Sequence, residues 1–269
     1  VSNLSARLRV TPGDGSRAVI VGFVIDGTAS TSILVRAVGP GLAQFGIADG
    51  LAAPKLQLFN SAGAIVAENN GWASSAHVAS TSTRVGAFAL AAGSADSAVV
   101  ANLPSGAYTA QVTAAGSGTV LIEVYDAATG AQLSTQQLVN ISTRGFVDTG
   151  DGALIVGFVV DGSATKRVLV RGIGPSLAQF GVSSVLADPV VKIYASGSAP
   201  AVAENDNWET APGISAAITA AGAFPLPAGS KDAAMVLDLP PGQYSAVITG
   251  AAGAAGAGRV EVYELPNPS

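Results

Sequence analysis

Residues 166–181 read KRVLVRGIGPSLAQFG, and residues 31–46 read TSILVRAVGPGLAQFG. Each copy begins with a run of β-branched and aliphatic residues, which favours a strand. A Gly-Pro pair follows, and Leu-Ala-Gln-Phe before a glycine predicts either a one-turn helix or a compact loop. The same piece of structure is therefore expected twice in one chain.

The repetition extends over nearly the whole chain. The matching pairs, at an offset of about 136 residues, are VGFVIDG (21–27) with VGFVVDG (156–162), ENNGW (68–72) with ENDNW (204–208), and LPSGAY (103–108) with LPPGQY (239–244). A period of this length makes each copy a domain rather than one rung of a solenoid. We predict two domains, residues 1–132 and residues 133–269.

Short runs of alternating polarity, separated by turn residues, fill each copy. The first run places four apolar side chains on one face of a strand, namely Leu4, Ala6, Leu8 and Val10. Seven or eight such strands at regular spacing predict an all-β protein made of two tandem antiparallel β-sandwich domains, jelly-roll-like in type.

Two local expectations accompany this fold. Asp26-Gly27 and its copy Asp161-Gly162 have the residue types of a tight turn, so each is expected to join its flanking strands into a hairpin. The segment 72–88 is rich in Ser and Thr and is expected to be a loop, whereas residues 212–221 of the second copy could carry a short helix.

The composition excludes several classes of protein. Charged residues make up 12% of the chain and hydrophobic residues 49%, against roughly 25% charged in an average soluble domain. The net charge of −5 without a basic cluster argues against a nucleic-acid partner. No apolar run approaches the roughly 18 residues of a membrane span, and cysteine is absent.

The expected location is extracellular or at the cell surface. The chain begins at Val1 and its one methionine is Met235, which suggests that a signal peptide has been removed. A composition rich in Ala, Gly, Ser and Thr and poor in Lys also fits an exported protein.

A family resemblance follows from the ordered succession NISTRG, GFVVDG, KRVLVRGIGPSLAQFG, ENDNW, LPPGQYSAVITG and VEVYEL. This succession resembles a repeat found in tandem in large secreted bacterial proteins. Its second half is similar to the pre-peptidase C-terminal (PPC-like) type of β-sandwich, in which a leucine, a Pro-Gly turn and a tyrosine open a late strand. The resemblance covers nearly all of both copies. It implies export and a jelly-roll-like sandwich, and it supplies no catalytic residues.

Reactive groups are scarce. The sequence contains no nucleophile elbow, no phosphate-binding glycine loop and no His or Cys ligand spacing. The single histidine, His77, has no counterpart in the second copy and is expected at the surface. We therefore expect a protein that is not an enzyme and that needs no cofactor.

Calcium is the one metal for which the sequence offers candidate ligands. Glu204, Asp206 and Asn207 form an oxygen-rich stretch of the kind that supplies calcium ligands. Turn formation by Asn and Asp side chains is the alternative interpretation of the same residues.

Two tryptophans, Trp72 and Trp208, occupy matching positions. An exposed pair could stack on sugar rings and so form a carbohydrate-binding platform. Alternatively, each indole could close the core of its sandwich, which is the usual place for such a ring.

Arg36 and Arg171 also match, and each stands among apolar residues on a predicted strand. A buried guanidinium needs a charged partner. We expect a structural ion pair, with Asp26 and Asp161, or the second matched pair Asp96 and Asp232, as the partners.

The tandem copies suggest a function. The geometry that joins two copies in one chain could recur between chains, and a head-to-tail contact that does not close a ring produces a filament. The first strand (Leu4, Ala6, Leu8, Val10) could be donated to a neighbour, with Leu265, Pro266 and Pro268 as a C-terminal contact. The prediction is a secreted structural fibre subunit that polymerises with itself. The alternatives are an adhesion or polysaccharide-binding module and an accessory domain pair of a larger exoprotein.

Overall fold

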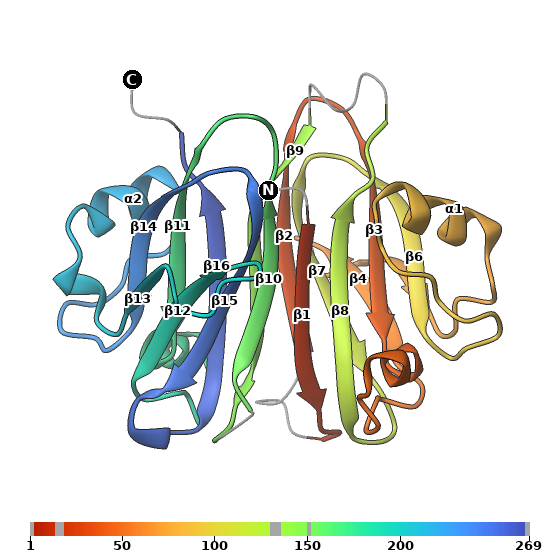
Figure 1. Cartoon of the computed structure of the whole chain (residues 1–269), viewed down its shortest axis with the longest axis horizontal. Coiled ribbons are helices and arrows are strands. Elements are labelled where there is room, and N and C mark those ends of the chain that lie inside the picture. Colours follow the sequence, from red (N-terminus) through yellow and green to blue (C-terminus); the bar gives the residue numbers. More distant parts are fainter. Residues whose placement is uncertain (1–2, 14–18, 130–135, 150–151, 267–269) are drawn as a thin grey trace. The chain divides into compact units, whose positions relative to one another are not determined.

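The computed structural model describes residues 3–13, 19–129, 136–149 and 152–266 (Figure 1). The chain divides into two compact units, Ser2–Val139 and Asn140–Ser269. The division falls inside strand β9 (Gln136–Val147), somewhat later than the boundary at residues 132 and 133 that the repeat suggested. Each unit is described separately below.

The first unit is a sandwich of two antiparallel sheets. Its strands are β1 (Asn3–Val10), β2 (Val19–Gly27), β3 (Thr31–Val38), β4 (Lys55–Asn60), β5 (Ile65–Asn69), β6 (Ser97–Leu103), β7 (Gly106–Thr113) and β8 (Gly118–Asp126). One sheet has the order β1-β8-β3-β6, here called the β1 sheet, and the other has the order β2-β7-β4-β5. This is the strand order of a jelly roll.

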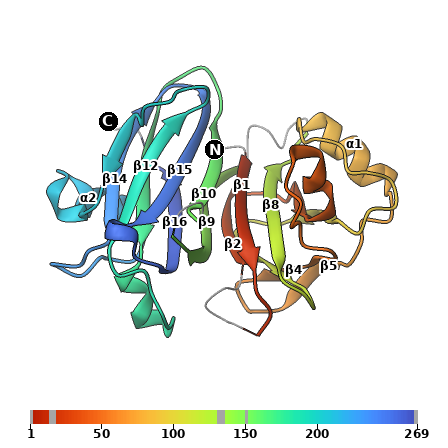
Figure 2. The same cartoon turned by 60° about the horizontal axis from the view of Figure 1, so that its bottom comes forward.

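The second unit repeats this topology. Its strands are β9, β10 (Leu154–Val160), β11 (Lys166–Ile173), β12 (Pro189–Ala195), β13 (Ala203–Asn205), β14 (Ala233–Leu239), β15 (Gly242–Gly250) and β16 (Gly256–Glu264). The order β9-β16-β11-β14 defines the β9 sheet, and β10-β15-β12-β13 forms the other layer (Figure 2). The predicted fold class, two tandem β-sandwiches of jelly-roll type, is confirmed.

The hairpin expected at Asp26-Gly27 is wrong. Strand β2 pairs with β7, whereas β3 pairs with β6 and β8, so the strands on the two sides of this turn belong to different sheets. The same holds for β10 and β11 around Asp161-Gly162. Turn residues reverse the chain, but whether the next strand joins the same sheet depends on which apolar faces must cover each other.

Strand β1 lies in its own unit. It pairs with β8 along its length, from Asn3 opposite Tyr125 to Val10 opposite Gly118. The predicted assembly residues Leu4, Ala6, Leu8 and Val10 are all buried there. Their alternation therefore reflects a strand that completes the core of the first sandwich.

The loop expected over residues 72–88 contains a helix, α1 (Ala76–Arg84), which contacts β6 and β3 of the β1 sheet (Figure 1). The Ser75 side chain accepts a hydrogen bond from the backbone N–H of Val78 and so caps the helix. Val78 is buried, together with Thr81 and Ser82. Serine and threonine are modest helix formers, and here packing against the sheet overrides their propensity.

The remaining helices of the described residues are short. They are α2 (Ile214–Ala220), within the range expected for the second copy, and the 3₁₀ turns η2 (Pro40–Phe45), η4 (Pro175–Phe180), η5 (Trp208–Thr210) and η6 (Ala251–Gly253). The one-turn helix expected after each Gly-Pro pair is thus present as η2 and η4. A Cβ atom at Gly39 would lie 2.0 Å from the carbonyl oxygen of Leu51, which explains why glycine precedes this proline.

Candidate interaction site

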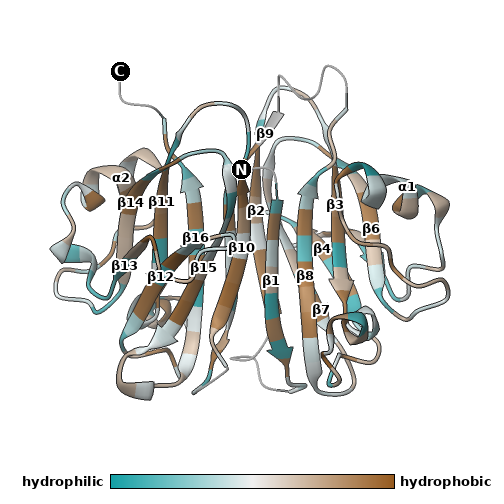
Figure 3. Cartoon of the chain, in the orientation of Figure 1, coloured by the Kyte–Doolittle hydropathy of each residue, from teal (hydrophilic) through white to brown (hydrophobic). Residues whose placement is uncertain are grey.

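Arg36 lies on β3, a strand between two others, and its side chain is fully buried. It shares the helix-covered face of the β1 sheet with Leu34 and Val38, which belong to the apolar cluster beneath α1. Figure 3 shows hydrophilic residues interrupting the otherwise apolar strands β3 and β11. A charge in this position needs partners on the neighbouring strand.

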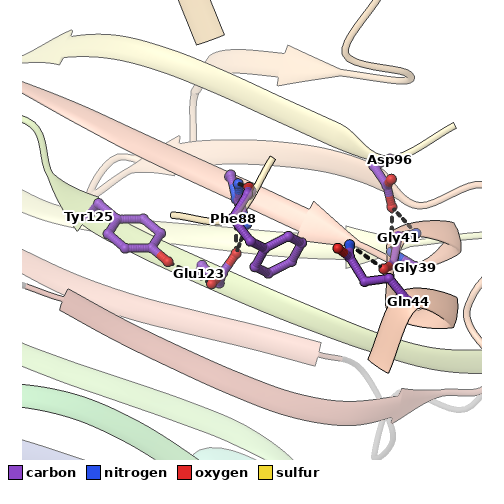
Figure 4. Close-up of polar contacts among 8 residues, drawn as sticks. Gly39, Gly41, Gln44, Phe88, Asp96, Glu123 and Tyr125 are labelled. Carbon is purple, nitrogen blue, oxygen red and sulfur yellow. Dashed lines mark hydrogen bonds and ion pairs between the residues drawn. The ribbon is translucent and has the colours of Figure 1, made fainter. Parts of the chain in front are cut away.

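Glu123 on β8 is the partner of Arg36. Nε and Nη2 of the arginine donate to Oε2 of Glu123 at 2.9 and 2.6 Å, and Nη1 donates to the carbonyl oxygen of Phe88 at 2.6 Å. The hydroxyl of Tyr125 donates to the other carboxylate oxygen, Oε1, at 2.7 Å. Figure 4 shows Glu123 between Tyr125 and Phe88. Both carboxylate oxygens are therefore hydrogen-bonded inside the protein.

The sheet register creates this pair, because Arg36 and Glu123 are directly opposite each other on β3 and β8. The partners expected from the sequence, Asp26 and Asp161, are incorrect. Both are exposed, and each accepts a hydrogen bond from the backbone N–H of the glycine that follows it. A turn at the end of a strand is remote from the middle of the next strand, which is where the charge lies.

The second unit has a related ion pair, but among the described residues its arginine and glutamate lack the two hydrogen bonds that join Arg36 and Glu123. Arg171 lies opposite Glu261, with Nε 3.1 Å from Oε2, and its Nη1 donates to the carbonyl oxygen of Phe224 at 2.8 Å. The other oxygen of Glu261, Oε1, lies 3.0 Å from Nε of Arg259. A second arginine therefore contacts the carboxylate oxygen that Arg171 leaves free.

Burial perturbs the two tyrosines beside these carboxylates. Removal from water, reinforced by the negative charge of Glu261, raises the pKa of Tyr263 to about 12. The pKa of Tyr125 is raised further above its usual value, by burial first and then by Glu123. Both phenols therefore remain neutral over the physiological range.

Asp96 holds the Gly-Pro turn that follows β3. Its Oδ1 accepts hydrogen bonds from the backbone N–H groups of Gly39 and Gly41 at 2.8 and 3.1 Å (Figure 4). Its Oδ2 accepts one from the hydroxyl of Ser94 at 2.7 Å. The carboxylate is fully buried, so these bonds replace its hydration. Asp96 therefore fixes the start of η2 and is not the ion-pair partner of Arg36.

Asp232 has the same role in the second unit. It accepts hydrogen bonds from the backbone N–H of Gly174 at 2.8 Å and from the backbone N–H and hydroxyl of Ser176. In both units a buried aspartate thus holds the short 3₁₀ turn against the sheet.

An exposed phenylalanine ends each of these turns. Phe45 is 56% exposed and Phe180 is 57% exposed. Their rings make edge-to-face contacts with Phe88 and Phe224, at centroid distances of 4.9 and 5.0 Å. We call Phe45 and Phe180 the two knobs. The turn that carries each knob is held at its start by a buried aspartate, Asp96 or Asp232.

The buried arginines support the knobs from below. Cζ of Arg36 lies 4.3 Å from the centroid of the Phe88 ring, and Cζ of Arg171 lies 4.2 Å from that of Phe224. Cation–π contact of this kind stabilises the ring beneath each knob. In each unit the contacts therefore run from the glutamate carboxylate to the arginine guanidinium, from there to the inner phenylalanine, and finally to the exposed phenylalanine. The result is a firmly held apolar ring in contact with solvent.

The two tryptophans close the cores. Trp72 is buried in the cluster beneath α1, and its Nε1 donates to the carbonyl oxygen of Ala91 and the hydroxyl of Ser94. Trp208 is half-buried against the corresponding cluster and donates to Ser230. The indole of Trp72 has no free face for a sugar ring, which agrees with the interpretation that it closes the core and not with the alternative of a platform of two exposed tryptophans.

The oxygen-rich stretch that begins in β13 does not bring its side-chain oxygens together at one point. Glu204 pairs with Lys192 at 3.2 Å, Asp206 is exposed, and the carbonyl oxygen of Asn207 accepts hydrogen bonds from Asn205 and Thr210. Within the described ranges, no group of three or more acidic, His or Cys side chains is placed to hold a metal ion. Calcium binding here stays a prediction.

The three residues of the expected C-terminal contact lie in different surroundings. Leu265 is buried in the core cluster of the second unit, and its backbone N–H donates to the carbonyl oxygen of Arg167. Pro266 is exposed, and Pro268 lies outside the described residues. Leu265 therefore belongs to its own sandwich.

Edge strands carry the other large exposed apolar side chains of the described residues. Ile65 and Val66 lie on β5, and Val202 lies directly before β13, at the position that matches Val66. Both strands end their sheets and are short. Lys55 pairs with Glu68 on β5, as Lys192 does with Glu204, which places charge along both edges.

The sequence did contain a signal for the residues that were missed. Glu123 and Glu261 stand two residues before a matched tyrosine on the closing strands, in IEVY and VEVY. A glutamate in an otherwise apolar strand of both copies indicates a buried partner for a buried arginine. Nothing in the sequence distinguishes Phe45 from a core residue.

The comparisons with known proteins identify no family. No protein-family model matches the chain. No curated protein matches it either. Among solved structures, the STIV MCP is 13% identical over 97% of this chain and 90% of that chain, with a TM-score of 0.26. Tandem CBM51 modules of a family 98 glycoside hydrolase from Streptococcus pneumoniae SP3-BS71 are 7% identical over 92% of this chain and 81% of that chain, also with a TM-score of 0.26. Likenesses this low carry no functional argument.

Proposed function

We propose that this protein is a non-catalytic structural subunit that polymerises with copies of itself, and that the two knobs are its contacts. The observation that carries the proposal is the presence of Phe45 and Phe180, both more than half exposed, at matching positions of the two units. Large aromatic side chains in water are typical of contact sites, because their burial supplies much of the free energy of association.

The contacts that hold each knob in place favour a role in binding a partner over an exposure that has no function. A ring that is already held in place loses little conformational entropy when a partner covers it. Phe45 gains this order from Phe88, whose carbonyl oxygen and ring both contact Arg36. A flexible surface phenylalanine would need no such buried network.

Because each chain has two equivalent knobs, it can contact at least two neighbouring chains. When a surface on one subunit binds a different surface on the next, the contact propagates and forms a filament unless its rotation closes a ring. The exposed Val66 and Val202 beside two sheet edges offer further apolar surface in both units. The subunit that we propose therefore adds to a homopolymer.

The proposed location is outside the cell, in a bacterium. The resemblance to repeats of secreted proteins, including the PPC-like sandwich, supports this proposal, as does a composition rich in Ala, Gly, Ser and Thr and poor in Lys. No helix in the described part of the chain has the length and apolar character to span a membrane. The net charge of −5 favours a protein or polysaccharide environment over nucleic acid.

Electron microscopy and sedimentation of the purified chain test the proposal. The unmodified protein should form long uniform fibres in a concentration-dependent manner. Phe45→Ser combined with Phe180→Ser should abolish them, while circular dichroism and the midpoint of urea unfolding stay close to those of the unmodified chain.

The matched control is Ala43→Ser combined with Ala178→Ser, which changes two exposed residues of the same 3₁₀ turns and should leave fibres intact. A chain that stays a single particle at high concentration would overturn the proposal. Retention of single particles by an immobilised glycan would then favour the alternative, a polysaccharide-binding module.

A further inference from the structure

Two arginines face each other in the second unit. Arg144 on β9 and Arg259 on β16 are direct cross-strand neighbours. Two positions along the same strands, and so on the same face of the sheet, Ser142 lies opposite Glu261. Like charges directly opposite each other destabilise a sheet, so this arrangement calls for a compensating negative charge.

The protein supplies only part of that charge. The carboxylate of Glu261 lies 3.1 Å from Nε of Arg171 and 3.0 Å from Nε of Arg259, so both of its oxygens are engaged. Arg259 also donates from Nη2 to the hydroxyl of Ser142 at 3.1 Å. The one carboxylate is thus already shared by two guanidinium groups, those of Arg171 and Arg259.

Arg144 is the arginine without compensation. Its Nε atom is buried and has no hydrogen-bond partner among the residues that the structure describes. Burial first, and then the positive charge of Arg259, lowers the pKa of Arg144, and no acidic group of the described residues offsets these effects. A guanidinium remains charged in proteins nonetheless, so an unmatched positive charge stays in place.

The first unit lacks this feature. Arg7 occupies the position of Arg144, but the residue opposite it on β8 is Leu121, where the second unit has Arg259. Arg36 and Glu123 there balance each other one to one. The arginine pair is therefore particular to the second unit and is not a requirement of the fold.

We propose that Arg144 and Arg259 together bind a small oxyanion, of the phosphate or sulfate class, on the β9 sheet of the second unit. Two guanidinium groups on adjacent strands present several N–H donors to one ligand, which suits an oxyanion with several acceptor oxygens. Arg259 is 31% exposed, so a ligand has access to the pair from solvent. The inference is independent of the knobs.

Titration with inorganic phosphate and with inorganic sulfate, at constant ionic strength, tests the site on the whole chain. We expect saturable binding by calorimetry, together with a rise in the melting temperature of the second unit. Arg144→Gln and Arg259→Leu should each weaken binding at least tenfold. Arg259→Leu places in the second unit the residue type that the first unit has at Leu121.

Arg7→Gln is the matched control, because it removes the corresponding arginine of the first unit and should leave binding unchanged. Far-ultraviolet circular dichroism identifies any variant that fails to fold. If Arg144→Gln does not fold, Arg144→Lys, which keeps the charge, replaces it, and we expect that variant to retain partial binding. Absence of saturable binding, or equal binding by the Arg144→Gln chain, would overturn the site. Fibre formation is a separate readout that this result does not affect.

Discussion

Arg36 donates two hydrogen bonds, from Nε and Nη2, to the same oxygen of Glu123, at 2.9 and 2.6 Å, across two neighbouring strands of the β1 sheet. Apolar residues of similar volume often stabilise a core as well as a buried ion pair does. The second unit nevertheless repeats the pair as Arg171 and Glu261. In both units the arginine also contacts the inner phenylalanine, so we infer that the pair positions the ring beneath the knob.

Removal of one partner of the buried ion pair should strongly lower the stability of the unit. Glu123→Gln leaves the guanidinium of Arg36 buried with an uncharged partner, and we expect a loss of about 3–5 kcal/mol in the free energy of unfolding of the first unit. Urea unfolding followed by tryptophan fluorescence measures it. Arg167→Gln, in an exposed pair 4.0 Å from Asp238, should change stability by less than about 1 kcal/mol. Equal effects of the two changes would contradict a structural role for Glu123.

The Gly-Pro turn should tolerate no side chain. Gly39→Ala would bring Cβ to 2.0 Å from the carbonyl oxygen of Leu51, and a backbone atom cannot move aside without shifting its segment. We expect a loss of about 2 kcal/mol or more in unfolding free energy. Gly116→Ala is the control, because the space around that residue is open. Thermal denaturation compares the two, and a stable Gly39→Ala chain would show that the turn is looser than described.

Alkaline pH should destabilise the second unit through Tyr263. Its pKa of about 12 in the folded state exceeds the usual value of 10 for a phenol, so the folded state keeps its proton more tightly than the unfolded state. The resulting contribution is complete below pH 10 and is lost between pH 10 and about 12, with a total of roughly 3 kcal/mol. Tyr263→Phe should flatten this part of the stability profile. A profile that is unchanged by the substitution would refute the assignment.

Assembly should not need the first strand to leave its unit. Arg7 and Leu121 are paired across β1 and β8, and the chain has no other cysteine, so Arg7→Cys with Leu121→Cys can form one disulfide that locks β1 in place. We expect the oxidised protein to polymerise as the reduced protein does. Fibres that appear only after reduction would instead favour donation of β1 between chains.

Some features of the fold could be predicted because they are local. The alternation of Leu4, Ala6, Leu8 and Val10 predicts a half-buried strand whatever the strand pairs with. The Gly-Pro pair predicts the turn that became η2. The helix α1 escaped prediction because Val78 and the cap at Ser75 matter only once the sheet beneath them exists.

The candidate site was predictable only in part. Arg36 and Arg171 could be identified, since an arginine among aliphatic strand residues must be buried and paired. Their partners could not, because a partner across a sheet is set by register rather than by distance along the chain. Phe45 resembled a core residue until the turn held by Asp96 placed its ring in solvent.

The sequence by itself determined that the chain consists of two copies of one β-sandwich. A repeat of domain length and an alternation of apolar and polar residues along each strand depend only on the order of residues. The tertiary structure alone decided which strands share a sheet, that Glu123 and Glu261 balance the buried arginines, and that two phenylalanines face solvent. These are relations between segments far apart in the chain. They arise only when both sheets bury their apolar faces together, which is a property of the whole unit and of no single stretch.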